Sequence, residues 1–288
     1  MGTALHGVSG RSGPAPRRRR CRRPDLGRGE RSGDEMTLRR PRRRAPGKAL
    51  KALLLALPLL APLSMATQAA TAGTPGTPAL PAGTLIENRT PDDGNRDLAV
   101  ILSGDGGWAD LDRQLGTVLA ARGISVLGFD CMKYFWDTRS PDATARDVNA
   151  TLAAYLKAWH KDRLVLIGFS FGAAVLPFIL ARMDAPLKSR VALATMLGSN
   201  TYANWEIHWG DWLHDEPHKS ALPVLPELAK VQGVRTLCVY GAEEEANSVC
   251  PTLPAGTAEV LRLPGGHHFD GNYEALASQI LRRVPSAR

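Results

Sequence analysis

Short apolar runs alternate with longer amphipathic stretches over residues 84–288. Most of the runs are almost continuously apolar, as strands covered on both faces must be. Helical spacing of the hydrophobic residues predicts helices at about 109–122, 140–160, 171–183 and 273–284. This alternation predicts an α/β fold with a mostly parallel sheet, helices on both of its faces and right-handed crossovers. The predicted strands are 98–103, 124–129, 163–168, 191–197, 236–240 and 258–263.

One segment, residues 200–233, interrupts the alternation between the fourth and fifth predicted strands. It carries Trp205, Trp209 and Trp212, three of the six tryptophans of the chain, within eight residues. An insertion of this length in a compact domain is usually a lid or a binding loop. The rings would equally fill a subsidiary core under the loop, and the two interpretations are compatible. We expect a Trp-rich lid insertion here.

The positive charge of the chain lies in its first part. Residues 1–51 hold 16 Lys/Arg and 4 Asp/Glu, so the remaining residues hold 20 basic and 24 acidic side chains. The basic stripes that a nucleic-acid interface needs are therefore missing from the predicted folded part, and we expect no nucleic-acid partner. Residues 1–35 are rich in Arg, Gly and Pro, and we expect a disordered or mis-annotated N-terminal extension.

Residues 36–72 have the layout of a signal peptide. A cationic stretch at 39–51 precedes a twelve-residue apolar run at 52–63, and small residues follow at 70–72. The apolar run is shorter than the ~20 residues of a membrane-spanning helix. We therefore expect export to the periplasm with cleavage near Ala72. A Pro/Gly/Thr linker at 73–83 then leads into the domain at 84–288.

Three cysteines follow the leader, namely Cys131, Cys238 and Cys250. An oxidising compartment allows two of them to pair. Cys250 lies twelve residues after Cys238, across one acidic turn, and we expect these two to form a disulfide. Three free thiols remain the alternative, because the sequence does not fix connectivity.

The strongest chemical signal is GFSFG at residues 168–172. It follows a predicted strand and precedes a predicted helix, which is the context of a nucleophile elbow. Glycines at both ends allow a turn tight enough to expose the serine hydroxyl at the carboxyl edge of the sheet. The sequence therefore predicts a serine hydrolase of the α/β-hydrolase fold, with Ser170 as its nucleophile.

A serine nucleophile needs a base, and the base needs an acid that orients it. In this fold the acid and the base follow the serine in that order. His267 is the expected base, with His268 as the alternative, because both follow the last predicted strand. Glu244 is the expected acid; the neighbours at 243 and 245 are the alternatives.

An oxyanion hole completes this type of site. We expect one backbone N–H from Phe171 and another from the loop after the first predicted strand, at Asp105 or Gly106. That glycine-rich loop lacks the spacing of nucleotide-binding motifs. We expect no cofactor, and ester hydrolysis by such a site requires no metal.

Together, SGDGGW at 103–108, YFW at 134–136, GFSFGA at 168–173 and PGGHHFDG at 264–271 resemble the VirJ/AcvB family of bacterial virulence proteins. The resemblance covers about residues 84–288 and the short, VirJ-like form. It implies a periplasmic α/β-hydrolase that cleaves aminoacylated phosphatidylglycerol, chiefly lysyl-phosphatidylglycerol, at the membrane surface. It also implies a link to virulence and type IV secretion, and with it secretion-system components as partners.

A lysyl group is cationic, and carboxylates and aromatic faces attract ammonium groups. We therefore expect Asp105, Tyr134 and Trp136 to bind the substrate. Further acids near these segments are Asp112, Asp130 and Asp137. The alternatives to this function are a general carboxylesterase or thioesterase, and a non-enzymatic periplasmic adaptor for secretion, since a fold alone does not prove an activity.

Overall fold

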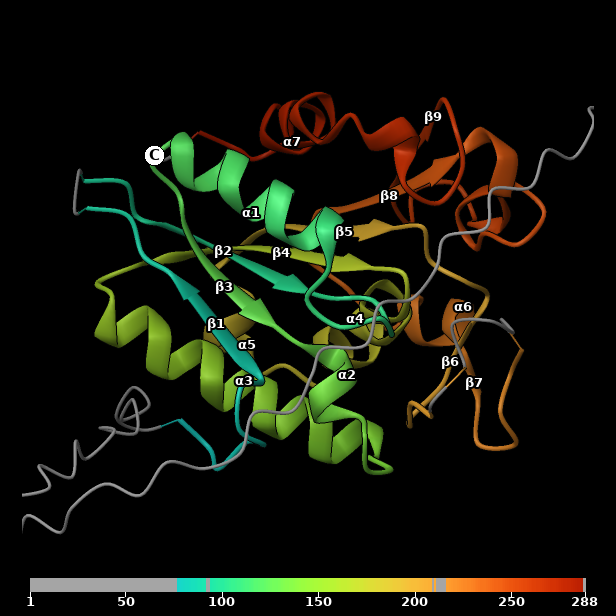
Figure 1. The fold of residues 1–288 in the computed structure, drawn as a ribbon, viewed down its shortest axis with the longest axis horizontal. Coiled ribbons are helices and arrows are strands. Elements are labelled where there is room, and N and C mark those ends of the chain that lie inside the picture. Colours follow the sequence, from blue (N-terminus) through green and yellow to red (C-terminus); the bar gives the residue numbers. More distant parts are fainter. Residues whose placement is uncertain (1–76, 92–93, 209, 211–215, 287–288) are drawn as a thin grey trace, which may run out of the picture. The chain divides into compact units, whose positions relative to one another are not determined.

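A seven-stranded sheet forms the centre of the computed structural model, which describes residues 77–91, 94–208, 210 and 216–286 (Figure 1). The strand order is β1-β3-β2-β4-β5-β8-β9. β1 is antiparallel to β3, and the other neighbours are parallel, so the mostly parallel sheet is confirmed. The strands of this sheet are β1 (Leu85–Asn88), β2 (Asp97–Leu102), β3 (Ser125–Phe129), β4 (Arg163–Phe169), β5 (Val191–Leu197), β8 (Thr236–Gly241) and β9 (Glu259–Leu263).

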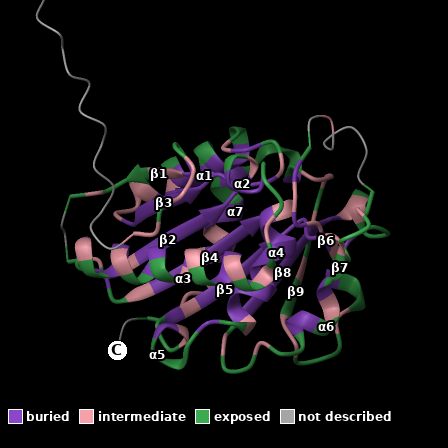
Figure 2. Cartoon of the chain, turned by 90° about the horizontal axis from the view of Figure 1, so that it is seen from below, coloured by how far each residue is buried: buried purple, intermediate pink, exposed green. Residues whose placement is uncertain are grey.

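Helices cover both faces of the sheet, as predicted (Figure 1). Along β2, Leu98 and Val100 belong to the core shared with α3 and α4, whereas Ala99 and Ile101 belong to the core shared with α1 and α7. Successive side chains of a strand point to opposite faces, so both faces need apolar residues. Figure 2 shows that the central strands are buried almost throughout. The helices are α1 (Asp110–Ala121), α2 (Cys131–Tyr134), α3 (Pro141–Ala158), α4 (Phe171–Ala181), α5 (Ala185–Lys188), α6 (Val224–Leu228) and α7 (Tyr273–Leu281).

Strand β1 and the shortest helices were not predicted. β1 is a four-residue edge strand that pairs only with β3, and half of its residues are exposed. It therefore lacks the continuous apolar run that marks the central strands. Helices of four or five residues, such as α2, α5 and α6, are too short to display a helical period.

The insertion at 200–233 contains a two-stranded sheet of β6 (Tyr202–Ala203) and β7 (Leu222–Pro223), followed by α6. Trp205 is buried, with its ring centroid 5.0 Å from that of Phe178 and 6.1 Å from that of Phe135. Trp205 therefore fills a subsidiary core. Trp209 and Trp212 lie outside the described residues, and the Trp-rich lid remains a prediction.

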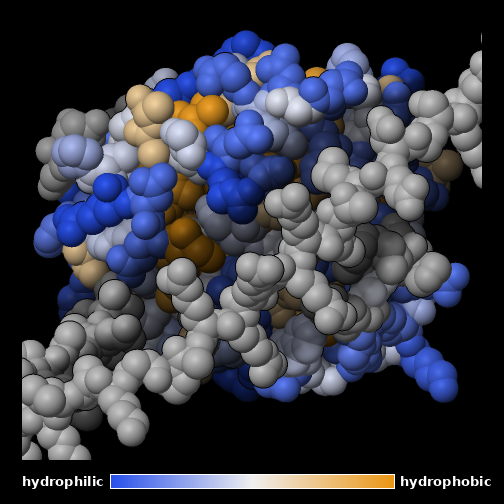
Figure 3. Space-filling view, in the orientation of Figure 1, coloured by the Kyte–Doolittle hydropathy of each residue, from blue (hydrophilic) through white to orange (hydrophobic). Residues whose placement is uncertain are grey.

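The predicted extension at 1–35 and the signal peptide at 36–72 also lie outside the described residues. Among the helices that the structure describes, none combines the length and the apolar character needed to cross a membrane. On the face drawn in Figure 3, hydrophilic residues predominate over the described part, and hydrophobic residues show mainly in a narrow strip between them.

Candidate active site

Ser170 occupies a sharp turn between β4 and α4, with φ 53° and ψ −115°. A positive φ at a non-glycine residue is strained, at a cost of about 1–3 kcal/mol, and such strain is common at functional sites. The flanking glycines make the turn possible. A Cβ atom on Gly168 would lie 2.4 Å from the carbonyl oxygen of Gly172, and one on Gly172 would lie 2.3 Å from that of Leu102. The local sequence therefore forms the predicted elbow.

Two backbone hydrogen bonds hold this elbow at the carboxyl edge of the sheet. The Ser170 amide donates to the carbonyl oxygen of Leu197, the last residue of β5, at 2.8 Å. The Gly172 amide donates to that of Ser103, just past β2, at 3.1 Å. The serine is therefore fixed between the ends of its two neighbouring strands.

His267 pairs with Glu244. Its Nδ1 lies 2.9 Å from Oε2 and 2.8 Å from Oε1 of that carboxylate. The imidazole also lies against the elbow, with its ring centroid 4.9 Å from that of Phe169, the residue before Ser170. A Cβ atom on Gly198 would lie 3.0 Å from His267 Nδ1. The expected base and acid are thus in contact beside the elbow.

Glu244 ends the 3₁₀ helix η2 (Ala242–Glu244), in a loop that is held at several points. The Glu243 amide donates to the carbonyl oxygen of Gly265 at 3.1 Å, which ties the acid loop to the histidine loop. The expected disulfide between Cys238 and Cys250 is present, with a Cα–Cα distance of 5.5 Å. It connects β8, before the acid, to the 3₁₀ helix η3 (Cys250–Thr252) after it.

The residues next to the expected acid and base make different contacts. Glu245 is exposed and pairs with Arg262 at 3.2 Å. Glu243 is also exposed. His268 Nδ1 lies 3.5 Å from the hydroxyl oxygen of Tyr273. Burial, and the neighbouring His267, lower the pKa of His268.

The loop after β2 lies next to the elbow. Residues 104–107 form a tight turn in which the Gly107 amide donates to the carbonyl oxygen of Gly104 at 3.2 Å. A Cβ atom on Gly104 would lie 3.4 Å from the Cβ of Ser170. Asp105 and Gly106 are therefore brought near the serine. Phe171 begins α4, and the first amides of a helix have no partner within it.

The three expected substrate-binding residues do not lie together in the structure. Tyr134 is fully buried, and its hydroxyl donates to Asp147 Oδ2 at 2.6 Å; burial and this carboxylate raise the pKa of Tyr134. Trp136 is 52% exposed. Of the three residues, only Asp105 lines the cavity at Ser170.

The other three acids lie apart from this cavity. Asp130 caps α2, with Oδ1 accepting from the Lys133 amide at 3.2 Å. Asp137 is 80% exposed. Asp112 Oδ2 accepts from the Ala109 amide at 3.1 Å, and burial raises the pKa of Asp112 to about 7.

The cavity that Ser170 lines has a volume of about 40 Å³. Its wall contains Glu206 and Glu216 besides Asp105. Neither glutamate was expected from the sequence, because the tryptophans are the more conspicuous feature of the insertion. The signal that could have indicated them is the high density of acidic and histidine residues at 206–218. A larger cavity of about 510 Å³, with Arg96, Lys161 and Arg190 in its wall, lies at the amino ends of the strands, away from Ser170.

Comparison with solved structures identifies the fold. The lipase-esterase related protein from Clostridium acetobutylicum ATCC 824 matches with a TM-score of 0.51 at 12% identity, over 70% of this chain and 100% of that chain. The 2,6-dihydroxy-pseudo-oxynicotine hydrolase matches with a TM-score of 0.50 at 14% identity, over 69% of this chain and 64% of that chain. These likenesses, with the observed topology, establish the α/β-hydrolase fold.

No curated protein sequence matches the chain significantly. A family model does: the one described as "Bacterial virulence protein (VirJ)" matches residues 96–288. This match includes the elbow, the acid loop and the histidine loop, and it spans more than half of the sequence. The chain therefore belongs to the VirJ family of bacterial virulence proteins.

Proposed function

We propose that this chain is a periplasmic serine hydrolase that cleaves the aminoacyl ester of aminoacylated phosphatidylglycerol, with lysyl-phosphatidylglycerol as its principal substrate. The observation that carries the proposal is the contact between His267 and Glu244, 2.9 Å from Nδ1 to Oε2, beside a serine in a strained elbow. A base that is oriented by an acid and lies next to a serine is the arrangement that activates a hydroxyl nucleophile.

In this mechanism the Ser170 hydroxyl attacks the ester carbonyl carbon, and His267 Nε2 accepts the hydroxyl proton. Glu244 holds Nδ1, which leaves Nε2 for the serine and stabilises the imidazolium that forms. His267 then donates the proton to the departing lipid oxygen. Water releases the aminoacyl group from Ser170 by the same steps, with His267 again acting as the base.

The negative charge of the tetrahedral intermediate needs backbone donors. The Phe171 amide, at the first position of α4, supplies one. Asp105 or Gly106, in the turn that lies against the elbow, supplies the other. Both donors belong to backbone that is already held in place, so the site needs little reorganisation as the charge develops.

The carboxylates at the cavity support a cationic acyl group. Asp105, Glu206 and Glu216 contribute three acidic side chains to the wall of the cavity at Ser170. Ammonium groups bind favourably beside carboxylates, and the attraction strengthens as water is excluded. A lysyl ester presents two ammonium groups to such a wall, and a plain acyl ester presents none.

The disulfide supports a location outside the cytoplasm, since such bonds persist in oxidising compartments. Periplasmic export also agrees with the signal-peptide pattern at 36–72. A link to type IV secretion belongs to the proposal through the VirJ family, and any secretion partner would act in the same compartment.

The test is hydrolysis of lysyl-phosphatidylglycerol by the purified protein, with lysine and phosphatidylglycerol as products. Ser170→Ala should lower kcat on the order of 10⁴-fold, the usual effect of losing a triad member. Ser220→Ala, at an exposed serine, is the matched control and should retain activity. Near-normal turnover by a folded Ser170→Ala protein would contradict the mechanism. Equal rates on lysyl and plain acyl esters would favour a general carboxylesterase, and inactive wild-type protein would favour an adaptor.

A further inference from the structure

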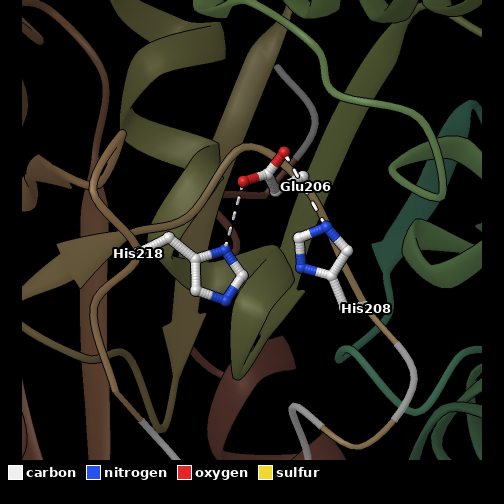
Figure 4. A group of neighbouring side chains, drawn as sticks. All are labelled: Glu206, His208 and His218. Atoms are coloured by element: carbon white, nitrogen blue, oxygen red, sulfur yellow. Dashed lines mark ion pairs between the residues drawn. The ribbon is translucent and has the colours of Figure 1, made fainter.

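Three potential metal ligands lie together in the insertion, and one of them, Glu206, lines the cavity at Ser170. Figure 4 shows His208 and His218 approaching the Glu206 carboxylate from two sides. Glu206 Oε1 lies 3.6 Å from His218 Nδ1, and Oε2 lies 4.0 Å from His208 Nε2. One ligand atom from each residue lies within 4.8 Å of the others. We propose that these three side chains form a zinc site.

The residue types fit zinc. Two imidazoles and one carboxylate are a known set of protein ligands for Zn²⁺, with a fourth position left for water or another ligand. With bonds of about 2.0–2.2 Å, ligand atoms around tetrahedral zinc lie roughly 3.4 Å apart. The observed separations are slightly longer than this and exceed ordinary hydrogen-bond lengths. Small side-chain rotations, of roughly 1 Å at the ligand atoms, would close the site around an ion.

Glu206 is held by its surroundings. The Thr138 hydroxyl donates to Glu206 Oε2 at 2.6 Å. On either side of Glu206, the Arg139 amide donates to the Trp205 carbonyl oxygen at 2.8 Å, and the Ile207 amide donates to that of Phe135 at the same distance. Such outer contacts orient metal ligands and raise metal affinity.

His218 is held against the same segment. Its amide donates to Asn204 Oδ1 at 3.0 Å, and Asn204 Nδ2 donates to the Glu216 carbonyl oxygen at 3.3 Å. One asparagine thus links the backbone that carries His218 to the backbone that carries Glu206. His208 is more exposed than either, so it is the ligand with the most freedom to complete the site.

Because of the position of Glu206, a bound ion would affect substrate binding. Its carboxylate also lines the cavity at Ser170, where it is one of three acidic side chains. A bound Zn²⁺ would neutralise that charge and weaken the attraction for an ammonium group. This effect on substrates rests on the proposed function, whereas the metal site itself does not. In this proposal the ion takes no part in the acyl transfer itself.

Titration of the tag-free protein with Zn²⁺, in competition with a chromogenic chelator, tests the site without any substrate. We expect one site with a dissociation constant of about 1 μM or below, equivalent to about 8 kcal/mol of binding free energy. His208→Ala and His218→Ala should each weaken binding at least as much as the loss of an outer contact does, ~10–100-fold. Mg²⁺, which prefers oxygen ligands in octahedral geometry, should not compete.

His160→Asn is the matched control, since His160 is an exposed histidine outside the cluster, and the titration should be unchanged. His160 has a positive φ of 53°, which asparagine tolerates. Circular dichroism confirms the fold of each variant, and the exposed His208 keeps the test valid if His218→Ala misfolds. Absence of Zn²⁺ binding by the wild type, or binding by both alanine variants as tight as that of the wild type, would overturn the site.

A kinetic comparison tests the consequence. Zn²⁺ should raise KM for lysyl-phosphatidylglycerol by about tenfold, the lower end of what one carboxylate contributes to ammonium recognition. It should leave p-nitrophenyl acetate hydrolysis unchanged, and His208→Ala should abolish the Zn²⁺ effect. Equal inhibition of both esters, or of His208→Ala, would contradict the role of Glu206. A protein that binds Zn²⁺ but cleaves no ester would overturn the proposed function and leave the metal site standing.

Discussion

Glu244 and His267 are 23 residues apart in sequence, yet Oε2 of one lies 2.9 Å from Nδ1 of the other. Of three consecutive glutamates, Glu244 makes this contact; the side chain of Glu245 reaches Arg262 instead, and Glu243 is exposed. It also occupies the nitrogen of His267 that points away from the proposed reaction. The imidazole is therefore held in one tautomer.

Replacing this acid should disable the proposed base while leaving the fold intact. We expect Glu244→Gln to lower kcat on the order of 10³–10⁴-fold, because the imidazole loses its orientation and its stabilising charge. Glu245→Gln is the matched control and should change kcat by less than about twofold, since that side chain is exposed. Steady-state kinetics on one ester substrate compares them; similar losses in both variants would contradict the assignment.

The disulfide should stabilise both the fold and the acid loop. Cys238 and Cys250 are twelve residues apart, and closing a loop of this size stabilises a protein by ~3 kcal/mol in the chain-entropy model. We expect reduction to lower the unfolding temperature and the esterase activity together. Thermal unfolding with and without dithiothreitol measures the first effect.

Cys131 provides the control for this experiment, because it is a buried free cysteine. Burial raises the pKa of its thiol, which makes it less reactive. The response of Cys131→Ala to reductant should therefore match that of the wild type. Mass mapping that found both Cys238 and Cys250 free in protein taken from the periplasm would contradict the prediction.

Asp105 should contribute to substrate choice. It is in the wall of the cavity at Ser170, and one well-placed carboxylate contributes ~1–3 kcal/mol to recognition of an ammonium group. We expect Asp105→Asn to raise KM for a lysyl ester more than for an alanyl ester. Asp137→Asn is the control, because Asp137 is exposed and outside the cavity. An equal loss of kcat on both esters would instead assign Asp105 to the oxyanion loop.

Asp112 should make stability depend on pH. Its pKa is raised to about 7 in the folded protein by burial, against about 3.9 in an unfolded chain. Between these values the folded state binds more protons, so the free energy of unfolding should fall as pH rises from about 4 to 7. Asp112→Asn removes this dependence and keeps an oxygen that accepts from the Ala109 amide. We expect the variant to gain a few kcal/mol over the wild type at about pH 8, and little at pH 4.

Urea unfolding at several pH values measures the difference. Gln114→Ala is the control in the same helix, since Gln114 is exposed and does not titrate, and it should leave the slope of stability against pH unchanged. A slope for Asp112→Asn equal to that of the wild type would show that folding does not raise the pKa of Asp112.

The sequence predicted the central strands closely because burial on both faces forces continuous apolar runs. The predicted run 163–168 corresponds to Arg163–Phe169, and 191–197 to Val191–Leu197. Strand β1 was not predicted because it lies at an edge of the sheet and half of its residues are exposed. Edge strands carry polar residues that hide their period.

The sequence predicts which loops form the proposed site, since loops at the carboxyl ends of parallel strands converge. It does not predict which of two adjacent histidines meets the acid, because that depends on contacts such as that of His268 with Tyr273. Tyr134 was expected at the substrate but packs in the core and bonds to Asp147. An aromatic residue in a conspicuous motif has the same appearance in sequence whether it packs or binds.

The position of β9 makes the proposed site less resistant to local unfolding than the core of the fold. β9 is an edge strand paired only with β8, and none of its side chains is fully buried. His267 follows it by four residues, whereas Ser170 follows the central strand β4. Edge segments open by local fluctuation at a lower free energy than central strands do, and their amides exchange with solvent sooner. Ser170 and the proposed base thus belong to regions of unequal protection, and fraying of one edge would separate them while the core stayed intact.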